Sequence, residues 1–148
     1  SAQVGQIATA ALAKLNTDLV KTLTNTTVSS LQPTQISALS TDQISALKTT
    51  SLTTGVLNSL TTANINVLTS STLNALSSAQ ISGIGATALK NLSTTTVAAL
   101  SNTAIKNLTT TQVQALTTDQ VVALTTAQIN AMSTAQIASL STDQLKVL

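Results

Sequence analysis

Aliphatic residues recur along this chain at two places in every eight. Stepping back from Leu148 by eight reaches a large aliphatic residue each time as far as Leu52, and a second unbroken series lies three residues earlier. The first series is Leu148, Leu140, Met132, Leu124, Leu116, Leu108, Leu100, Leu92, Ile84, Leu76, Leu68, Leu60 and Leu52; the second is Leu145, Ile137, Ile129, Val121, Val113, Ile105, Val97, Leu89, Ile81, Leu73, Ile65 and Leu57. The pattern predicts an eight-residue tandem repeat whose fifth and eighth positions face a core.

One repeat breaks the step. Leu52 lies five residues after Leu47, so the segment 48–52 is a repeat shortened by three residues. Before it the eight-residue step resumes and continues back to Ile7. We therefore interpret residues 1–148 as a single repeat array, with a first block at 1–47, a truncated repeat at 48–52 and a second block of regular repeats at 53–148.

Two regular structures fit this period poorly. In an uninterrupted α-helix, eight residues overshoot two turns, so the apolar stripe would rotate by roughly 80° per repeat. In a β-strand, the two apolar positions are separated by odd numbers of residues and would fall on opposite faces. Neither structure gives the aliphatic residues a common buried side.

A short helix that restarts in every repeat fits better. Most repeats begin with Ser or Thr, and Gln often follows three residues later, which is the pattern of a helix-capping box. The predicted pairs are Ser40 with Gln43, Ser77 with Gln80, Thr109 with Gln112, Thr117 with Gln120, Thr125 with Gln128, Ser133 with Gln136, and Ser141 with Gln144. The fifth and eighth positions then share one helix face. The sequence predicts an all-α fold with one very short helix per repeat.

Helices this short are unstable in isolation, so each must be held between neighbours. The sequence therefore predicts a solenoid, or superhelix, in which the aliphatic positions line a continuous central core. Two or three repeats could complete one turn of the coil. The pairs Asp18 and Asp42, and Asp119 and Asp143, are both 24 residues apart, which favours three.

Two segments depart from the consensus. Residues 2–15 are rich in Ala and lack Ser or Thr at the first position of a repeat. We expect one longer helix there, with Asn16 or Thr17 capping the next helix. Gly83 and Gly85 flank Ile84, and Gly85 replaces the usual hydroxyl residue. We expect a looser corner between helices at that point.

Composition narrows the possible functions. Apolar residues make up 43% of the chain, which is typical of a folded protein, but only 7% of residues are charged, against about 25% in an average domain. The six basic residues are all Lys and the four acidic residues are all Asp, and the chain contains no Cys, His or aromatic residue. Disulfides and thiolate metal sites are therefore excluded, and no apolar run is long enough for a membrane span.

The residues for common active-site chemistry are also scarce. Nucleophilic catalysis needs a positioned base, and without His only scattered Lys and Asp remain. We predict no catalytic, cofactor-binding or metal-ligating residues, no enzymatic activity and no cofactor. Nucleic-acid binding is not expected, because there is neither a basic stripe nor a stacking aromatic; Lys90 and Lys106 share the sixth position and indicate a solvated face. Acceptor patterns for N-glycosylation begin at Asn25, Asn91 and Asn107, and regular Thr rows leave an ice-binding surface as an alternative.

Repeats such as LTTDQVVALTTAQINAM, at 116–132, resemble the short Ser/Thr-rich tandem repeats of very large bacterial surface and secreted proteins, including adhesin-like proteins. The resemblance implies an extracellular or cell-surface structural array whose neighbours are flanking repeats of the same protein. Our leading hypothesis is a non-enzymatic spacer, stalk or scaffold without membrane insertion. The alternative is a solenoid module that binds a protein or glycan partner in adhesion.

Overall fold

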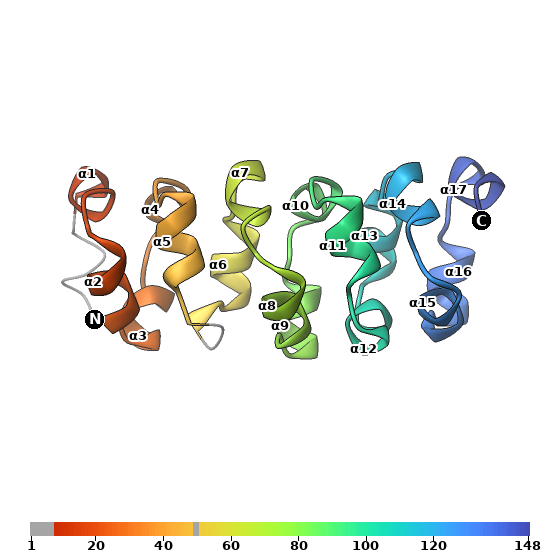
Figure 1. Cartoon of the computed structure of the whole chain (residues 1–148), viewed down its shortest axis with the longest axis horizontal. Helices are drawn as coiled ribbons and strands as arrows, with labels where there is room; N and C mark the ends of the chain where they lie inside the picture. The colour runs from red at the N-terminus through yellow and green to blue at the C-terminus, as the bar shows by residue number, and fades with distance from the viewer. Residues whose placement is uncertain (1–7, 49–50) are drawn as a thin grey trace.

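The computed structural model describes residues 8–48 and 51–148, which form a rod with the two ends of the chain at opposite ends (Figure 1). The described residues contain seventeen short helices and no strand, which confirms the predicted all-α solenoid. The helices are α1 (Thr9–Leu12), α2 (Thr17–Thr22), α3 (Asn25–Ser29), α4 (Pro33–Ser37), α5 (Thr41–Ala46), α6 (Thr54–Asn58), α7 (Thr62–Ile65), α8 (Ser70–Asn74), α9 (Ser78–Ser82), α10 (Ala86–Lys90), α11 (Thr94–Ala98), α12 (Asn102–Lys106), α13 (Thr110–Ala115), α14 (Thr118–Val122), α15 (Thr126–Ala131), α16 (Thr134–Ala138) and α17 (Thr142–Lys146).

Most helices start directly after a Ser or Thr residue that opens the repeat. At α14, the Gln120 backbone N–H donates to Thr117 Oγ1 at 3.1 Å, and the Thr117 backbone N–H donates to Gln120 Oε1 at 2.9 Å. Both bonds occur at all seven predicted pairs, so the capping boxes are confirmed. These bonds satisfy backbone donors that a helix start otherwise leaves unpaired.

The corners between helices need no glycine. The N–H of the eighth residue bonds to the carbonyl of the fifth, as from Leu124 to Val121 at 3.1 Å, and the chain then becomes extended at the next cap residue. No described residue has a positive φ. The expected looser corner at Gly83 is not seen, because Gly83 has φ −82° and ψ −8°, close to φ −84° and ψ −11° at Ser139 in a regular repeat.

Gly83 instead allows two turns of the coil to approach closely. A Cβ atom built on Gly83 would lie 2.7 Å from the Thr54 Cβ and 2.9 Å from its Cα, closer than real Cβ contacts. Thr54 is the first residue of α6, and Gly83 follows α9, three repeats later. A larger residue at this position would push the two helices apart.

Successive turns of the coil stack on one another. Helices three repeats apart pack together, as α11 packs on α14 and α14 on α17, and α8 also contacts α12, four repeats later. One turn therefore takes between three and four repeats, slightly more than the three favoured by the aspartate spacing.

The truncated repeat keeps its place in the coil without contributing a regular helix. Across it, α4 packs on α6 and α5 on α7, which are three repeats apart only if 48–52 is counted as a repeat. Leu52 and Ser51 are buried, and the Ser51 hydroxyl donates to Asn25 Oδ1 at 2.6 Å. Shortening the repeat thus preserves the stacking order.

The N-terminal prediction is only partly right. Asn16 caps α2 as expected, because its Oδ1 accepts the Leu19 backbone N–H at 2.8 Å. The longer helix is wrong for the described residues: α1 spans only Thr9–Leu12, and Ala8 before it has ψ 134°, which is not helical. The rest of the expected helix, at 2–7, lies outside the described residues.

A continuous aliphatic core runs along the rod. The fifth and eighth positions are buried through most of its length, including Val28, Ile65 and Val113. The prediction is wrong at the C-terminal end, where Leu145 is 51% exposed and Leu148 is 53% exposed. No further turn of the described chain packs over these two residues, because covering a core position requires a helix three to four repeats later.

Candidate functional site: the glutamine ladder and the polar surface

The glutamine at the fourth position joins successive turns of the coil. While Gln120 Oε1 caps its own helix, its Nε2 donates to the Leu89 carbonyl at 3.0 Å and to the Leu92 carbonyl at 2.7 Å. These acceptors lie 31 and 28 residues earlier, at the fifth and eighth positions of the repeat four units upstream. One buried carboxamide therefore fixes both a helix start and the register between two turns.

The same bonds recur in five consecutive repeats, which we call the glutamine ladder. Its members are Gln112, Gln120, Gln128, Gln136 and Gln144, and their Nε2 atoms bond the carbonyl pairs Ile81 and Ile84, Leu89 and Leu92, Val97 and Leu100, Ile105 and Leu108, and Val113 and Leu116. All five side chains are buried. Gln43 makes the same pair of bonds to Leu12 and Leu15 near the N-terminus.

The capping pattern predicts the bond of each glutamine to its own helix start but not the second bond, to the preceding turn. One signal in the sequence could have found it. Glu serves a capping box as well as Gln does, yet the chain contains no Glu. A Glu carboxylate has no N–H to donate and would face two carbonyl oxygens. The exclusive use of Gln is explained by the bond to the preceding turn.

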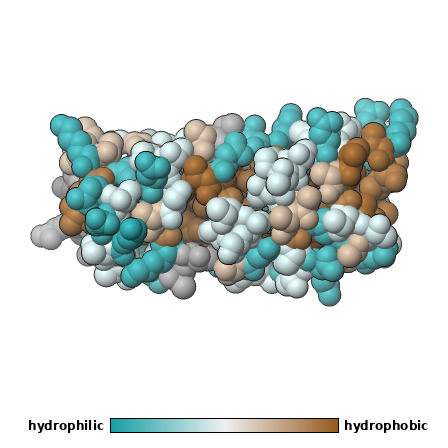
Figure 2. Space-filling view, in the orientation of Figure 1, coloured by the Kyte–Doolittle hydropathy of each residue, from teal (hydrophilic) through white to brown (hydrophobic). Residues whose placement is uncertain are grey.

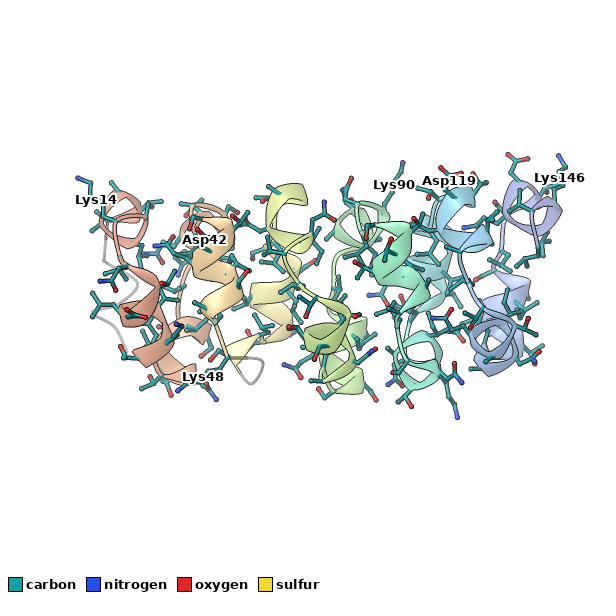
Figure 3. The ribbon with its side chains drawn as sticks, viewed as in Figure 1. Lys14, Asp42, Lys48, Lys90, Asp119 and Lys146 are labelled. Atoms are coloured by element: carbon teal, nitrogen blue, oxygen red, sulfur yellow. The ribbon has the colours of Figure 1, made fainter. Side chains whose placement is uncertain are left out.

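Charged side chains do not gather into a site. The charged residues labelled in Figure 3 are spread along the whole rod. Lys21 forms an ion pair with Asp18, and Lys146 with Asp143, each at 3.3 Å within one helix. Because the side chains are well exposed, these pairs contribute little to stability. In the described part of the chain, no group of three or more potential metal ligands occurs.

Two of the three candidate glycosylation asparagines, Asn25 and Asn91, form side-chain hydrogen bonds. Asn25 accepts from the Ser51 hydroxyl, and Asn91 Nδ2 donates to the Thr87 carbonyl at 2.7 Å. Lys90 and Lys106 lie in the last turns of α10 and α12. Their positive charge interacts favourably there with the partial negative charge of the helix C-terminus. These contacts give Asn and Lys structural roles at the surface.

Two hollows with polar lining residues lie in the middle of the rod. A hollow of about 380 Å³ opens between α6, α9, α10 and α13, and a second of about 440 Å³ adjoins it between α6 and α10. Both are lined by Asn58, Gly85 and Ala86, and the first also by Thr54, Ser82 and Thr111. The lining can offer only neutral hydroxyl, amide and backbone groups to a ligand.

The rest of the visible face is mainly polar, with hydrophobic residues most evident toward the C-terminal end (Figure 2). Val122 is 62% exposed, and with Val147 and Leu148 it lines a smaller groove there. A search of the described helices for an apolar stretch that could cross a membrane finds none.

A comparison with known protein families supports a tandem repeat in this chain. The family described as the ALTTAQ repeat matches residues 97–126 and again 121–148. Residues 123–128 read ALTTAQ and include the cap residue Thr125 and the ladder residue Gln128. The match confirms that the chain contains a tandem repeat. No curated protein and no solved structure matches this chain.

Proposed function

We propose that this chain is a non-enzymatic structural module, a spacer, stalk or scaffold within a larger bacterial extracellular protein. The observation that carries the proposal is that the recurring polar groups of the repeat form hydrogen bonds within the fold. In each ladder repeat, the hydroxyl caps a backbone N–H and the glutamine carboxamide bonds to its own cap and to the preceding turn. The repeated chemistry is thus directed at building a rod.

The shape supports the same proposal. The rod separates the two ends of the chain (Figure 1), and every added repeat lengthens it, since each packs only on nearby repeats. Its surface is rich in neutral polar side chains and sparse in charge. Such a surface keeps a long array hydrated without attracting a charged partner.

A length series tests the spacer proposal. Seven consecutive repeats, close to two turns of the coil, would be duplicated, and the end-to-end distance measured by small-angle scattering. A spacer requires the longest dimension to grow in proportion to the added repeats while circular dichroism per residue stays constant. A compact particle whose longest dimension does not grow would overturn the proposal.

The setting requires a separate experiment. A single exposed Thr118→Cys in the full-length protein can be labelled with a membrane-impermeant maleimide on intact cells. The unaltered full-length protein is the control, since this chain itself contributes no thiol. Labelling of intact cells supports an extracellular array. Labelling only after lysis would refute that placement and leave the spacer proposal standing.

The hollow beside Gly83 and Gly85 favours a second candidate function, a glycan-binding module. Its neutral lining, including Asn58 and Ser82, could exchange hydrogen bonds with sugar hydroxyls. A glycan array would be probed with the unaltered chain and with Asn58→Leu. Saturable binding lost in this variant would favour the module over a passive spacer, and a blank array would eliminate this candidate.

A further inference from the structure

The contact between two turns in the middle of the rod differs from those on its C-terminal side. We call it the central interface; it joins the turn containing α6–α8 to the turn containing α10–α12, where α7 packs on α10 and α8 on α12. On its C-terminal side the glutamine ladder holds every repeat to the turn before it. The fourth positions that would span the central interface are Ala88, Thr96 and Ala104.

None of these three side chains can reproduce the ladder bonds. Thr96 bonds locally to the Ser93 hydroxyl at 2.8 Å, and Ala88 and Ala104 have no polar side-chain atom. By the ladder's spacing of 31 and 28 residues, a glutamine at position 96 would reach the Ile65 and Leu68 carbonyls. This interface therefore lacks three successive bridges that the next turn possesses.

The Asn74 side chain does form bonds across the central interface, but it is more exposed than the ladder glutamines. Its Nδ2 donates to the Ala99 carbonyl at 3.0 Å, and its Oδ1 accepts the Ser101 N–H at 2.6 Å. These bonds compete with water, whereas the ladder carboxamides bond in the buried interior. A hydrogen bond that water can replace resists opening less than one whose loss leaves buried groups unpaired.

Surface hollows also open beside this interface. The hollows of about 380 and 440 Å³ both lie between α6 and the α9–α10 segment. Gly85 replaces the cap hydroxyl there, and α10 has no side-chain cap bond. Missing bridges, a missing cap and open volume therefore coincide at one level of the rod.

We propose that the central interface is a built-in flexure, at which the rod bends while the ladder segment on its C-terminal side moves as a rigid body. In a solenoid each repeat contacts only its neighbours. Bending is therefore concentrated at a weak inter-turn contact and is not spread over the whole chain. This property does not depend on the spacer function, because it concerns the rod itself.

The test compares distance distributions between paired spin labels. Ala63→Cys with Ala127→Cys spans the central interface, whereas Ala79→Cys with Asp143→Cys spans only ladder-bridged contacts. Both pairs are 64 residues apart and occupy exposed third positions of their repeats. We expect a broader distribution for the first pair. Equal widths would overturn the proposal.

Two matched substitutions then test the cause. Thr96→Gln should narrow the first pair's distribution by adding a bridge to Ile65 and Leu68, while Thr95→Gln places the same side chain in solvent and should leave it broad. In the opposite direction, Gln128→Ala should broaden the second pair's distribution. Circular dichroism checks that each variant is folded. If Gln128→Ala is folded and the second pair stays narrow, the bridges do not control bending and the proposal fails.

Discussion

Removing one ladder glutamine should destabilise the rod far more than removing a surface glutamine. Gln128 is 1% exposed; its Oε1 accepts the Thr125 N–H at 2.7 Å, and its Nε2 donates to the carbonyls of Val97 and Leu100 at 3.0 and 2.7 Å. Gln128→Ala removes these three bonds and a longer one from Nε2 to the Ala98 carbonyl at 3.3 Å, and it leaves buried groups without partners. At about 0.5–1.5 kcal/mol for each of the three shorter bonds, the expected loss is about 1.5–4.5 kcal/mol of unfolding free energy.

Urea unfolding followed by circular dichroism provides the measurement, since the chain has no aromatic residue for fluorescence. Gln114→Ala is the matched control, because Gln114 is exposed at the sixth position of the same kind of repeat. Gln128→Glu should be at least as damaging as Gln128→Ala, since a carboxylate cannot donate to the two carbonyls. Equal midpoints for Gln128→Ala and Gln114→Ala would refute the proposed role of the ladder.

Three further substitutions test the packing and the caps. Leu89→Ala should lower the free energy of unfolding by about 2–5 kcal/mol, because Leu89 is buried. Leu124→Ala should lower it by less, because Leu124 is only partly buried. If urea unfolding gave similar losses for both variants, the burial pattern would be contradicted. Gly83→Ala should lower the thermal midpoint because its Cβ would collide with Thr54, whereas Gly55→Ala, whose nearest neighbour is 3.9 Å away, should raise it slightly; midpoints that rise together would refute the close approach. Asn16→Ala should cost about 0.5–2 kcal/mol through the lost cap of α2, and unchanged amide exchange at Leu19 would count against that cap.

Much of this fold was predictable because its signals are local. The bonds that start each helix join residues three apart, so Thr117 and Gln120 carry their own structural information. The wrong prediction of a longer N-terminal helix has a local cause as well. High helix propensity in Ala10 and Ala11 suggested a long helix, but α1 has only four residues in the described part of the chain, because intrinsic propensity is a weak preference that packing can override.

The prediction that the chain has no catalytic residue rests on composition alone and stays a prediction. The glutamine ladder gives a structural role to one abundant polar residue of the repeat. Gln120 could be recognised as a cap but not as a bridge, since its acceptors at Leu89 and Leu92 lie in another turn. The position of those acceptors depends on how many repeats complete the turn. No residue within a single repeat specifies that number.

The sequence by itself therefore determined the repeat length, the helix starts and the residues available for a core, because capping and periodicity act within eight residues. Only the tertiary structure decided the repeats per turn, the second role of glutamine, the need for Gly83 and the exposure of Leu145. Each of these depends on contacts between repeats three or four units apart. Such contacts arise from small corner rotations that accumulate along the coil before any two turns meet.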